Sequence, residues 1–586
     1  MTGRGSRRLP VLAGLLLSCV TLAGNGRELA RTAARILRAP RPWPGPARTV
    51  ESPGLDGLRA LVRERMPDEG PLRVFRKDPR GLRSEERYVL VALSFDRAPA
   101  RVVPTASPDV PDGASILVPE AFEPTVYARN GWLVPAGRSD GYALLLSPEA
   151  KRPEDGGGPA PEPAALPSAA NGTPAQRELL GWIPAVLVLA VCGAWGGWAW
   201  ALAGLYLYTV LLLFAVVMGA GGASAVPWAA AFASAASPGL RGRCRPPVPG
   251  LRRRRGFAFV LSAAVLLFGG LLTLSSTAIS PAALGSVGGR ARTLWLCGGF
   301  PPDFFSDRAR EILQPSYPPG AMLLALGADA AGGVAGEWLS RLPFVAALAA
   351  FALFAGLRMR RAEWLAPFAA LVLSPVPFRL MEGGHPEAFA VLFMAVGLSR
   401  ILDSDGADGI GWSLLCAAAW FKNEGFVLVL AAAISLWLCG EGGKASIRVV
   451  FLASLPPVLW FLGVRLAGGG LPDTAPVWNP SAGGPVLAAG WFWRNAILRP
   501  WSYAFVFPAG AALAATAVCR RVRPSSADLF LLLSTAGLLS VYAFSRAASP
   551  LWHVATSLPR LLWPPAVLFV FWKGTREGNV PAATSK

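Results

Sequence analysis

Runs of about 20 apolar residues recur along most of this chain, and they constrain its fold more than any other feature. Backbone N–H and C=O groups inside a bilayer must be paired within their own segment, so such runs predict membrane-spanning α-helices. The composition agrees, because 53% of the 586 residues are hydrophobic and only 16% are charged. The sequence therefore predicts a mainly α, polytopic membrane helical bundle of about 12–14 spans.

Charges between the runs predict their direction. Cytoplasmic loops carry an excess of Lys and Arg, and the loop Leu240–Gly256 holds seven arginines. A weak run at 222–238 is accepted as a span because only an odd number of crossings leads from an outer domain to this loop. The expected spans are 179–197, 199–218, 222–238, Phe257–Ile279, Trp338–Leu357, Trp364–Leu380, Ala388–Ile401, Trp412–Phe421, Phe426–Leu438, Val449–Leu466, Trp501–Val518, Leu529–Phe544 and Leu561–Phe571. Every Arg cluster between spans then lies inside, which predicts a multi-pass protein of the plasma (inner) membrane.

The net charge of +20 is explained by these loops. The sequence shows no run of basic residues interleaved with aromatic residues, so nucleic acid is not an expected partner. The seven cysteines form no CxxC pair and predict no disulfide framework. The two histidines exclude a multi-His metal site, and no metal ligand is predicted. A carboxylate-bound divalent cation is left open as a cofactor.

Composition divides the chain into six segments. They are an N-terminal anchor or signal (1–24), an extracytoplasmic α/β domain (25–147), a Pro/Gly-rich linker (148–177), additional membrane helices with a basic loop (178–255), the main membrane domain (256–573) and a cytoplasmic tail (574–586). An uncleaved anchor is favoured for the first segment because no small-x-small cleavage site follows it.

The segment 25–147 is charged and Pro-rich, unlike the rest of the chain. A short amphipathic helix is expected at Asp56–Met66, and Glu85–Phe95 is open as helix or strand. Short strands are expected at Leu72–Arg76, Arg101–Val103, Ser115–Val118, Trp132–Val134 and Tyr142–Leu146. No glycine-rich phosphate loop occurs here, so the segment is interpreted as a small domain without nucleotide chemistry.

The most polar stretch between two apolar runs is Gly298–Gly320, with the sequence GGFPPDFFSDRAREILQPSYPPG. Pro and Gly prevent one long helix, so a structured outer loop with a short central helix is expected. It carries Asp303 and Asp307 and ends in a Tyr-Pro-Pro-Gly turn that begins at Tyr317. An ordinary solvated connector is the alternative interpretation.

Two further polar turns fall at outer ends of predicted spans. One contains His385 and Glu387, and an imidazole beside a carboxylate at a membrane boundary suits proton transfer or orientation of a hydroxyl. The other is the hairpin tip Lys422-Asn423-Glu424, where an ammonium suits a phosphate. The alternatives are an interfacial turn with polar caps and a lysine that snorkels to the surface.

The stretch before the last span contains His553 and Arg560. A guanidinium at the membrane surface suits a bidentate phosphate contact, and an interfacial Trp–Arg anchor is the alternative. These polar groups fall on one face of the predicted bundle. This convergence is what a lipid-phosphate-sugar donor and a hydroxyl acceptor would require.

The order DFFSD, PSYPPG, GGHPEAFA, AAWFKNEG and WHVATSLPRLL resembles bacterial multi-pass glycosyltransferases of the GT-C fold. These are relatives of protein O-mannosyltransferases and lipid A aminoarabinose transferase. The resemblance covers roughly residues 256–573, and YPPG and KNEG are its most specific parts. It implies transfer of a hexosyl or pentosyl group from a polyprenyl-phosphate donor to an extracytoplasmic glycan, lipid or protein acceptor. Membrane lipid is an implied partner, and the active face is extracytoplasmic.

The resemblance and the residue chemistry together give candidate sites. The predicted catalytic carboxylates are Asp303, Asp307 and Glu387, and the predicted substrate-binding residues are Tyr317, His385, Lys422, Asn423, Glu424, His553 and Arg560. Similar proteins usually carry an acidic residue just after the span before the YPP loop, but Ser280–Arg290 has none. Asp303, Asp307 or Glu311 are the candidates to replace it. A transporter or flippase of lipid-linked sugar, or a catalytically degenerate GT-C-like scaffold, is the alternative function.

Overall fold

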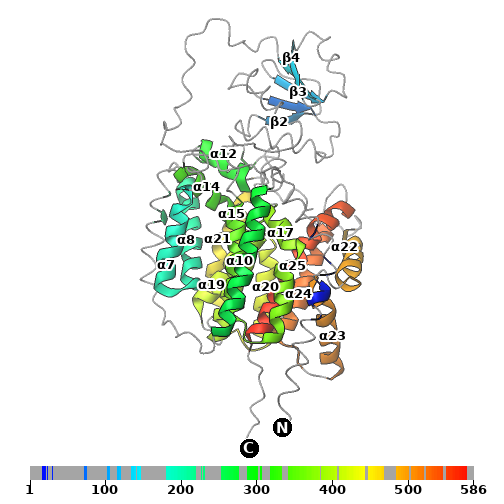
Figure 1. Ribbon diagram of the computed structural model, residues 1–586. Coiled ribbons are helices and arrows are strands. Elements are labelled where there is room, and N and C mark those ends of the chain that lie inside the picture. Colours follow the sequence, from blue (N-terminus) through cyan, green and yellow to red (C-terminus); the bar gives the residue numbers. More distant parts are fainter. Residues whose placement is uncertain are drawn as a thin grey trace, which may run out of the picture.

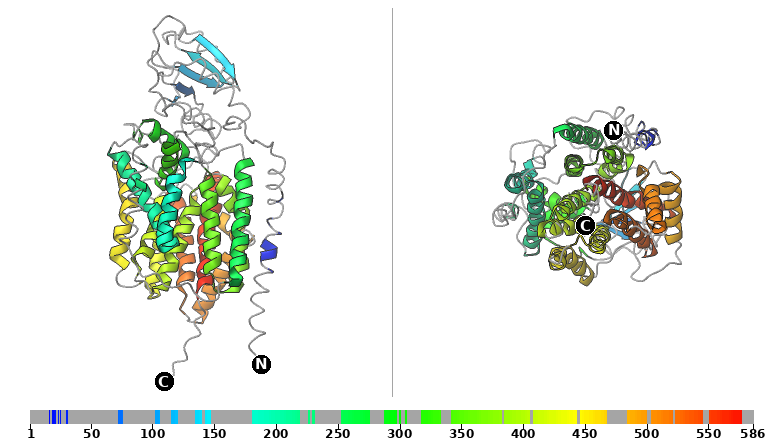
Figure 2. Two further views of the ribbon diagram at one scale, coloured as in Figure 1. Left: turned by 60° about the vertical axis from the view of Figure 1, so that its left-hand side comes forward. Right: turned by 90° about the horizontal axis from the view of Figure 1, so that it is seen from below.

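The structure is a computed structural model, and it describes most of the chain beyond residue 180 together with short pieces before it. The described residues are 16, 18–21, 23, 25, 30, 72–75, 102–105, 115–119, 134–139, 142–146, 180–218, 226, 229–230, 252–275, 287–297, 299–300, 304–305, 317–332, 341–382, 384–404, 408–442, 446–467, 484–499, 503–520, 523–544 and 550–576. Helices dominate this part, which confirms the predicted mainly helical class. Figures 1 and 2 show them side by side in one bundle.

The helical elements follow one another along the bundle as short and medium-length segments. They are α7 (Ile183–Gly196), α8 (Trp198–Val217), α10 (Arg252–Ser275), α12 (Gly289–Cys297), α14 (Gly320–Gly332), α15 (Leu342–Arg358), η4 (Ala362–Trp364), α16 (Leu365–Val372), α17 (Pro375–Glu382), α18 (Glu387–Asp403), α19 (Gly409–Phe421), α20 (Gly425–Leu438), α21 (Ser446–Leu466), α22 (Gly484–Phe492), η6 (Trp493–Ile497), α23 (Val506–Cys519), α24 (Ser526–Ser540), η8 (Val541–Phe544) and α25 (Pro550–Thr575).

The first described elements are strands of one sheet. They are β1 (Leu72–Phe75), β2 (Val102–Thr105), β3 (Ser115–Pro119), β4 (Val134–Ser139) and β5 (Tyr142–Leu146), in the order β2-β1-β3-β5-β4. β1 runs parallel to both of its neighbours, and β5 runs antiparallel to β3 and β4. The fourth strand begins at Val134, where the expected one ends. The expected helix at Asp56–Met66 and the segment Glu85–Phe95 lie outside the described residues. The sheet lies beyond the end of the bundle that carries α12 (Figure 1).

Two of the described helices are long and apolar enough to cross a membrane, Trp198–Val217 and Arg255–Thr273. A third candidate is the pair Ala362–Val372 and Pro375–Met381, which is bent by 49°. The straight span expected over Trp364–Leu380 is therefore broken. Proline has no N–H to donate to the preceding turn, so Pro375 starts a new helix instead of continuing the old one.

The C-terminal region differs from the expected one in two places. The stretch between the expected spans Val449–Leu466 and Trp501–Val518 contains α22 and the π-helix η6. The outer loop expected before Arg560 is instead the first half of α25, a helix of 26 residues with three internal prolines. Val554 and Leu558 in this half are fully buried. Tertiary packing therefore sustains the helix where local propensity predicts a break. Arg560 consequently lies inside a helix and not in a surface loop.

Close helix pairs in the bundle meet at small residues. A Cβ on Gly397 of α18 would lie 2.7 Å from the Gly411 carbonyl oxygen of α19. A Cβ on Gly356 of α15 would lie 2.8 Å from the Ala258 Cβ of α10. Small residues at such contacts let backbones approach closely, which is the usual packing of helices in membranes.

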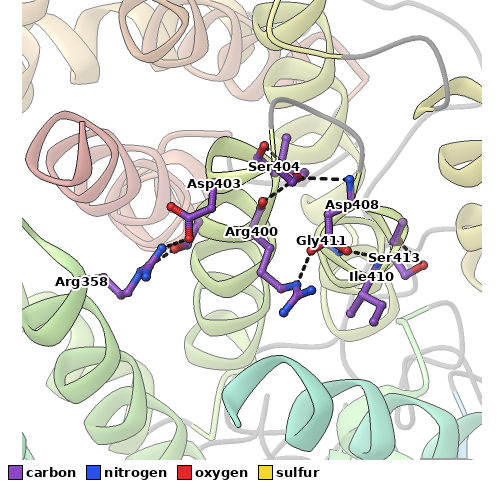
Figure 3. A network of polar contacts seen from close by, with 11 residues as sticks. Arg358, Arg400, Asp403, Ser404, Asp408, Ile410, Gly411 and Ser413 are labelled. Atoms are coloured by element: carbon purple, nitrogen blue, oxygen red, sulfur yellow. Dashed lines mark hydrogen bonds and ion pairs between the residues drawn. The ribbon is translucent and has the colours of Figure 1, made fainter. Parts of the chain in front are cut away.

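One end of the bundle is closed by ion pairs, and we call it the basic end. Arg358 at the end of α15 pairs with Asp403 at the end of α18, and Arg400 pairs with Asp408 (Figure 3). Asp408 also caps α19, because its side chain accepts hydrogen bonds from the first backbone N–H groups of that helix. Further pairs at this end are Lys573–Asp528 and Arg576–Glu441.

Candidate functional site

A buried lysine lies where α19 ends, a full helix length from the basic end. The Lys422 Nζ atom lies 3.2 Å from Glu387 Oε1 and 3.5 Å from Glu424 Oε2. It also lies 5.3 Å from the centroid of the Tyr317 ring, a cation–π distance. The side chains of Lys422 and Glu387 are only 4% and 2% exposed. We call Tyr317, His385, Glu387, Lys422, Glu424 and Arg560 the Lys422 cluster.

Lys422 owes its position to a tight turn between two helices. α19 ends at Phe421 and α20 begins at Gly425, and the Lys422 carbonyl accepts a hydrogen bond from the Gly425 N–H. A Cβ on Gly425 would come within 2.6 Å of the Ala418 carbonyl oxygen, so the turn requires glycine. The hairpin with its tip at Lys422–Gly425 is therefore present, as the sequence predicts.

Glu387 is placed by the turn between α17 and α18. Gly384 has a φ of 61°, in the left-handed region that favours glycine. Pro386 is the residue before the helix, and Glu387 is its first residue. A carboxylate at a helix N-terminus is stabilised by the helix dipole. The same turn therefore directs Glu387 to Lys422 and leaves His385 beside it.

Arg560 reaches the cluster from the middle of α25. Its Nη1 atom lies 3.0 Å from Nδ1 and 2.9 Å from Nε2 of His385, so the guanidinium donates to whichever ring nitrogen carries no proton. Burial, followed by the nearby charge of Arg560, lowers the pKa of His385 from 6.5 to about 3. His385 is therefore a neutral hydrogen-bond acceptor near pH 7. In the described part of the chain, no carboxylate lies within ion-pair distance of Arg560.

The Tyr-Pro-Pro-Gly turn is held by two residues that the sequence analysis did not identify. Arg290 in α12 is buried and donates to the carbonyl oxygens of Tyr317 (2.7 Å) and Pro318 (3.1 Å). Trp460 in α21 donates its indole N–H to the same Tyr317 oxygen at 3.1 Å. These bonds fix the backbone that presents the Tyr317 ring to Lys422. An arginine just ahead of the polar loop was the only sequence signal for this contact.

A second missed pair lies beside Arg560. The hydroxyl oxygens of Tyr542 and Ser557 are 2.6 Å apart, and both side chains are buried. Ser557 precedes Arg560 by three residues on α25, so the two side chains share a face of the helix. Hydroxyl groups there can donate or accept hydrogen bonds beside the cluster.

Not every predicted site residue lies in the cluster. Asp303 and Asp307 lie outside the described residues, and so does the side chain of His553. Asn423 stands in the hairpin turn, where its carbonyl accepts from the Phe426 N–H at 3.1 Å. The Asn423 side chain remains a predicted substrate contact.

The cluster combines two cations with two carboxylates. Burial alone would lower the pKa of Lys422, but Glu387 and then Glu424 outweigh this effect and raise it. Lys422 is therefore a permanent cation that its two partners already neutralise, whereas Arg560 keeps a charge available to an anion. Among the described residues, no three His, Cys, Asp or Glu side chains are grouped to hold a metal ion. Between Glu387 and Glu424 the cation is the ammonium of Lys422.

Comparisons of this chain with protein-family models, with curated proteins and with solved structures find no match.

Proposed function

We propose that this chain is a multi-pass membrane glycosyltransferase that moves a sugar from a polyprenyl-phosphate donor to an extracytoplasmic acceptor. The observation that carries the proposal is the convergence of the Lys422 cluster. Six side chains chosen for phosphate or hydroxyl chemistry come from four separated stretches of sequence and meet around the buried pair of Lys422 and Glu387. Buried ionisable groups inside an apolar bundle are costly, and they usually mark a functional site.

Helix lengths support a site below the outer surface of the membrane. The positive-inside rule assigns the basic end to the cytoplasm. α18 runs from Asp403 at that end to Glu387 in the cluster, and its 17 residues span about 25 Å. The hydrocarbon core is about 30 Å thick. Helices that end at a buried site need not be full spans, which accounts for their short lengths in a multi-pass protein.

Exposed apolar side chains support the same placement. Val260 in α10 is 70% exposed, and Phe451 and Leu466 in α21 are 66% and 80% exposed. Such side chains cover several helices of the bundle, whereas a soluble monomer rarely exposes large contiguous apolar patches. Contact with lipid tails would remove these side chains from water. These side chains support a place in a lipid bilayer, and the plasma (inner) membrane with the active face outside is part of the proposal.

The proposed reaction uses the cluster as an anion and sugar site. The acceptor hydroxyl oxygen attacks the anomeric carbon, the bond from that carbon to the phosphate oxygen breaks, and the electron pair leaves with polyprenyl phosphate. Arg560 stabilises the charge that develops on the phosphate. A base takes the hydroxyl proton. Glu387 is a poor base because its charge is stabilised by Lys422, so Asp303 and Asp307 remain the proposed bases.

A transfer assay tests this function. The full-length chain in lipid nanodiscs would receive a polyprenyl-phosphate hexose or pentose whose sugar is radiolabelled, together with cell-envelope acceptors. The release of polyprenyl phosphate would then be measured. Arg560→Gln should reduce turnover about 100-fold, whereas Arg576→Gln at the basic end should not. Unchanged turnover in Arg560→Gln contradicts the phosphate role. Movement of the intact lipid-linked sugar across liposomes without release of polyprenyl phosphate favours the flippase instead.

A further inference from the structure

The Lys422 cluster contains buried polar atoms without hydrogen bonds. Glu387 Oε1 and Oε2, Glu424 Oε2 and Arg560 Nε are all buried, and none forms a hydrogen bond with another described residue. Lys422 partners two of these oxygens as an ion pair, at 3.2 and 3.5 Å, so the unmet hydrogen-bonding capacity is greatest at Glu387 Oε2 and Arg560 Nε. Buried polar groups in proteins are nearly always hydrogen-bonded, so atoms left over in one place indicate a missing partner.

The chemistry of these atoms specifies that partner. Three are carboxylate oxygens, which accept hydrogen bonds only, and one is a guanidinium N–H, which donates only. A phosphate diester offers acceptors and no donors, so it can satisfy Arg560 but neither Glu387 nor Glu424. Sugar hydroxyls donate, and they suit the carboxylate oxygens. The partner must therefore present hydroxyl groups on one side and an anion on the other.

The charges of the cluster also place the anion and the hydroxyl groups on different sides. Lys422 is already flanked by two carboxylates, and an anion placed there would be repelled by both. Arg560 faces neutral His385 instead. An anion is therefore stabilised on the Arg560 side, and the carboxylate side is left for neutral donors.

We infer that the donor lies in this site with its sugar hydroxyls on Glu387 and Glu424 and its phosphate on Arg560. The inference rests on the proposed function and deepens it, because it gives the two carboxylates a sugar-binding role. Lys422 is then a positioning residue that keeps both carboxylates ionised and in place. The site discriminates between a lipid phosphate that carries a sugar and one that does not.

Two lipids that differ only in the sugar test this orientation. Binding of decaprenyl phosphate and of decaprenyl-phosphate mannose to the full-length chain in nanodiscs would be measured by tryptophan fluorescence. Glu424→Gln should weaken binding of the mannosylated lipid about tenfold, ~1.4 kcal/mol, and leave the bare lipid unweakened. Arg560→Gln should weaken both lipids. Glu441→Gln, the same substitution at the basic end, should change neither.

The outcomes separate the inference from the function on which it rests. If Glu424→Gln and Glu387→Gln weaken both lipids equally, or neither lipid, the orientation is wrong, whereas the phosphate site is decided separately by Arg560→Gln. If the unaltered chain binds neither lipid, the proposed function fails first. The Glu424 side chain is 22% exposed, so its variant is expected to fold even where Glu387→Gln does not.

Discussion

Removal of the Lys422 ammonium should destabilise the protein more than removal of a cation that keeps some contact with water. In Lys422→Met a chain of similar length keeps the packing, but two carboxylates lose their partner. At an effective dielectric constant of about 20, charges 3.2 Å apart attract by roughly 5 kcal/mol. Breaking a buried ion pair from one side typically costs about 3–5 kcal/mol. We therefore expect a loss of about 3–5 kcal/mol in the free energy of unfolding.

The matched control lies at the basic end. Lys573 Nζ lies 2.8 Å from Asp528 Oδ1, closer than the pair in the cluster, but these side chains are 17% and 13% exposed. Because both side chains keep some contact with water, the carboxylate left behind is better solvated and screened than one in the Lys422 cluster. Lys573→Met should therefore cost much less than Lys422→Met, even though the distance alone suggests the opposite.

A double-mutant cycle identifies the cause. If the stability lost in Lys422→Met comes from a buried carboxylate left without its ion-pair partner, then adding Glu387→Gln should restore about 2 kcal/mol. This value lies within the range of coupling between contacting residues. Unfolding in mixed micelles of rising SDS content, followed by tryptophan fluorescence, gives each free energy. Purely additive losses in the double variant, or equal losses in Lys422→Met and Lys573→Met, would refute the reasoning.

Three further outcomes follow from single contacts. Trp460→Phe removes one of the donors to the part-buried Tyr317 carbonyl and should cost about 1 kcal/mol. An unchanged free energy of unfolding would show that this bond is not formed. In the unfolded chain, His385 takes up a proton below about pH 6.5. In the folded chain its pKa is about 3, so His385 stays neutral down to about that pH. The free energy of unfolding should therefore fall on acidification from pH 6.5 to 5. His385→Gln should reduce this dependence on pH. An equal reduction in His553→Gln would contradict the assignment of the pH dependence to His385. A Cβ on Gly320 would lie 2.7 Å from a carbonyl oxygen of α19, whereas one on Gly463 meets nothing within 4 Å. Gly320→Ala should cost about 1–3 kcal/mol and Gly463→Ala should not destabilise, so similar melting temperatures would count against the close contact.

The parts of the site that could be predicted from sequence depend on local signals. The turn at Lys422–Gly425 follows from polar residues and a glycine between two apolar runs, and the turn at Gly384–Glu387 follows from glycine and proline before an apolar run. Each of these signals lies within a few residues. Local chain geometry therefore placed two of the three turns that build the cluster.

The rest depends on contacts between residues far apart in sequence. The bonds from Arg290 and Trp460 to Tyr317 join three helical regions, and no local pattern encodes them. The position of Arg560 inside α25 depends on burial of that helix, which outweighs its three internal prolines. Such tertiary effects are decided by packing, so sequence patterns alone could not predict them.

The proposed site is tested most directly by locating a lipid-linked sugar on the protein. A polyprenyl-phosphate sugar with a photoreactive group next to its phosphate would be crosslinked to the full-length chain in nanodiscs, and the labelled peptides would be identified by mass spectrometry. We expect labelling around His385 and Arg560 that excess unlabelled lipid suppresses. Suppressible labelling confined to the basic end, around Arg358 or Arg400, would contradict it.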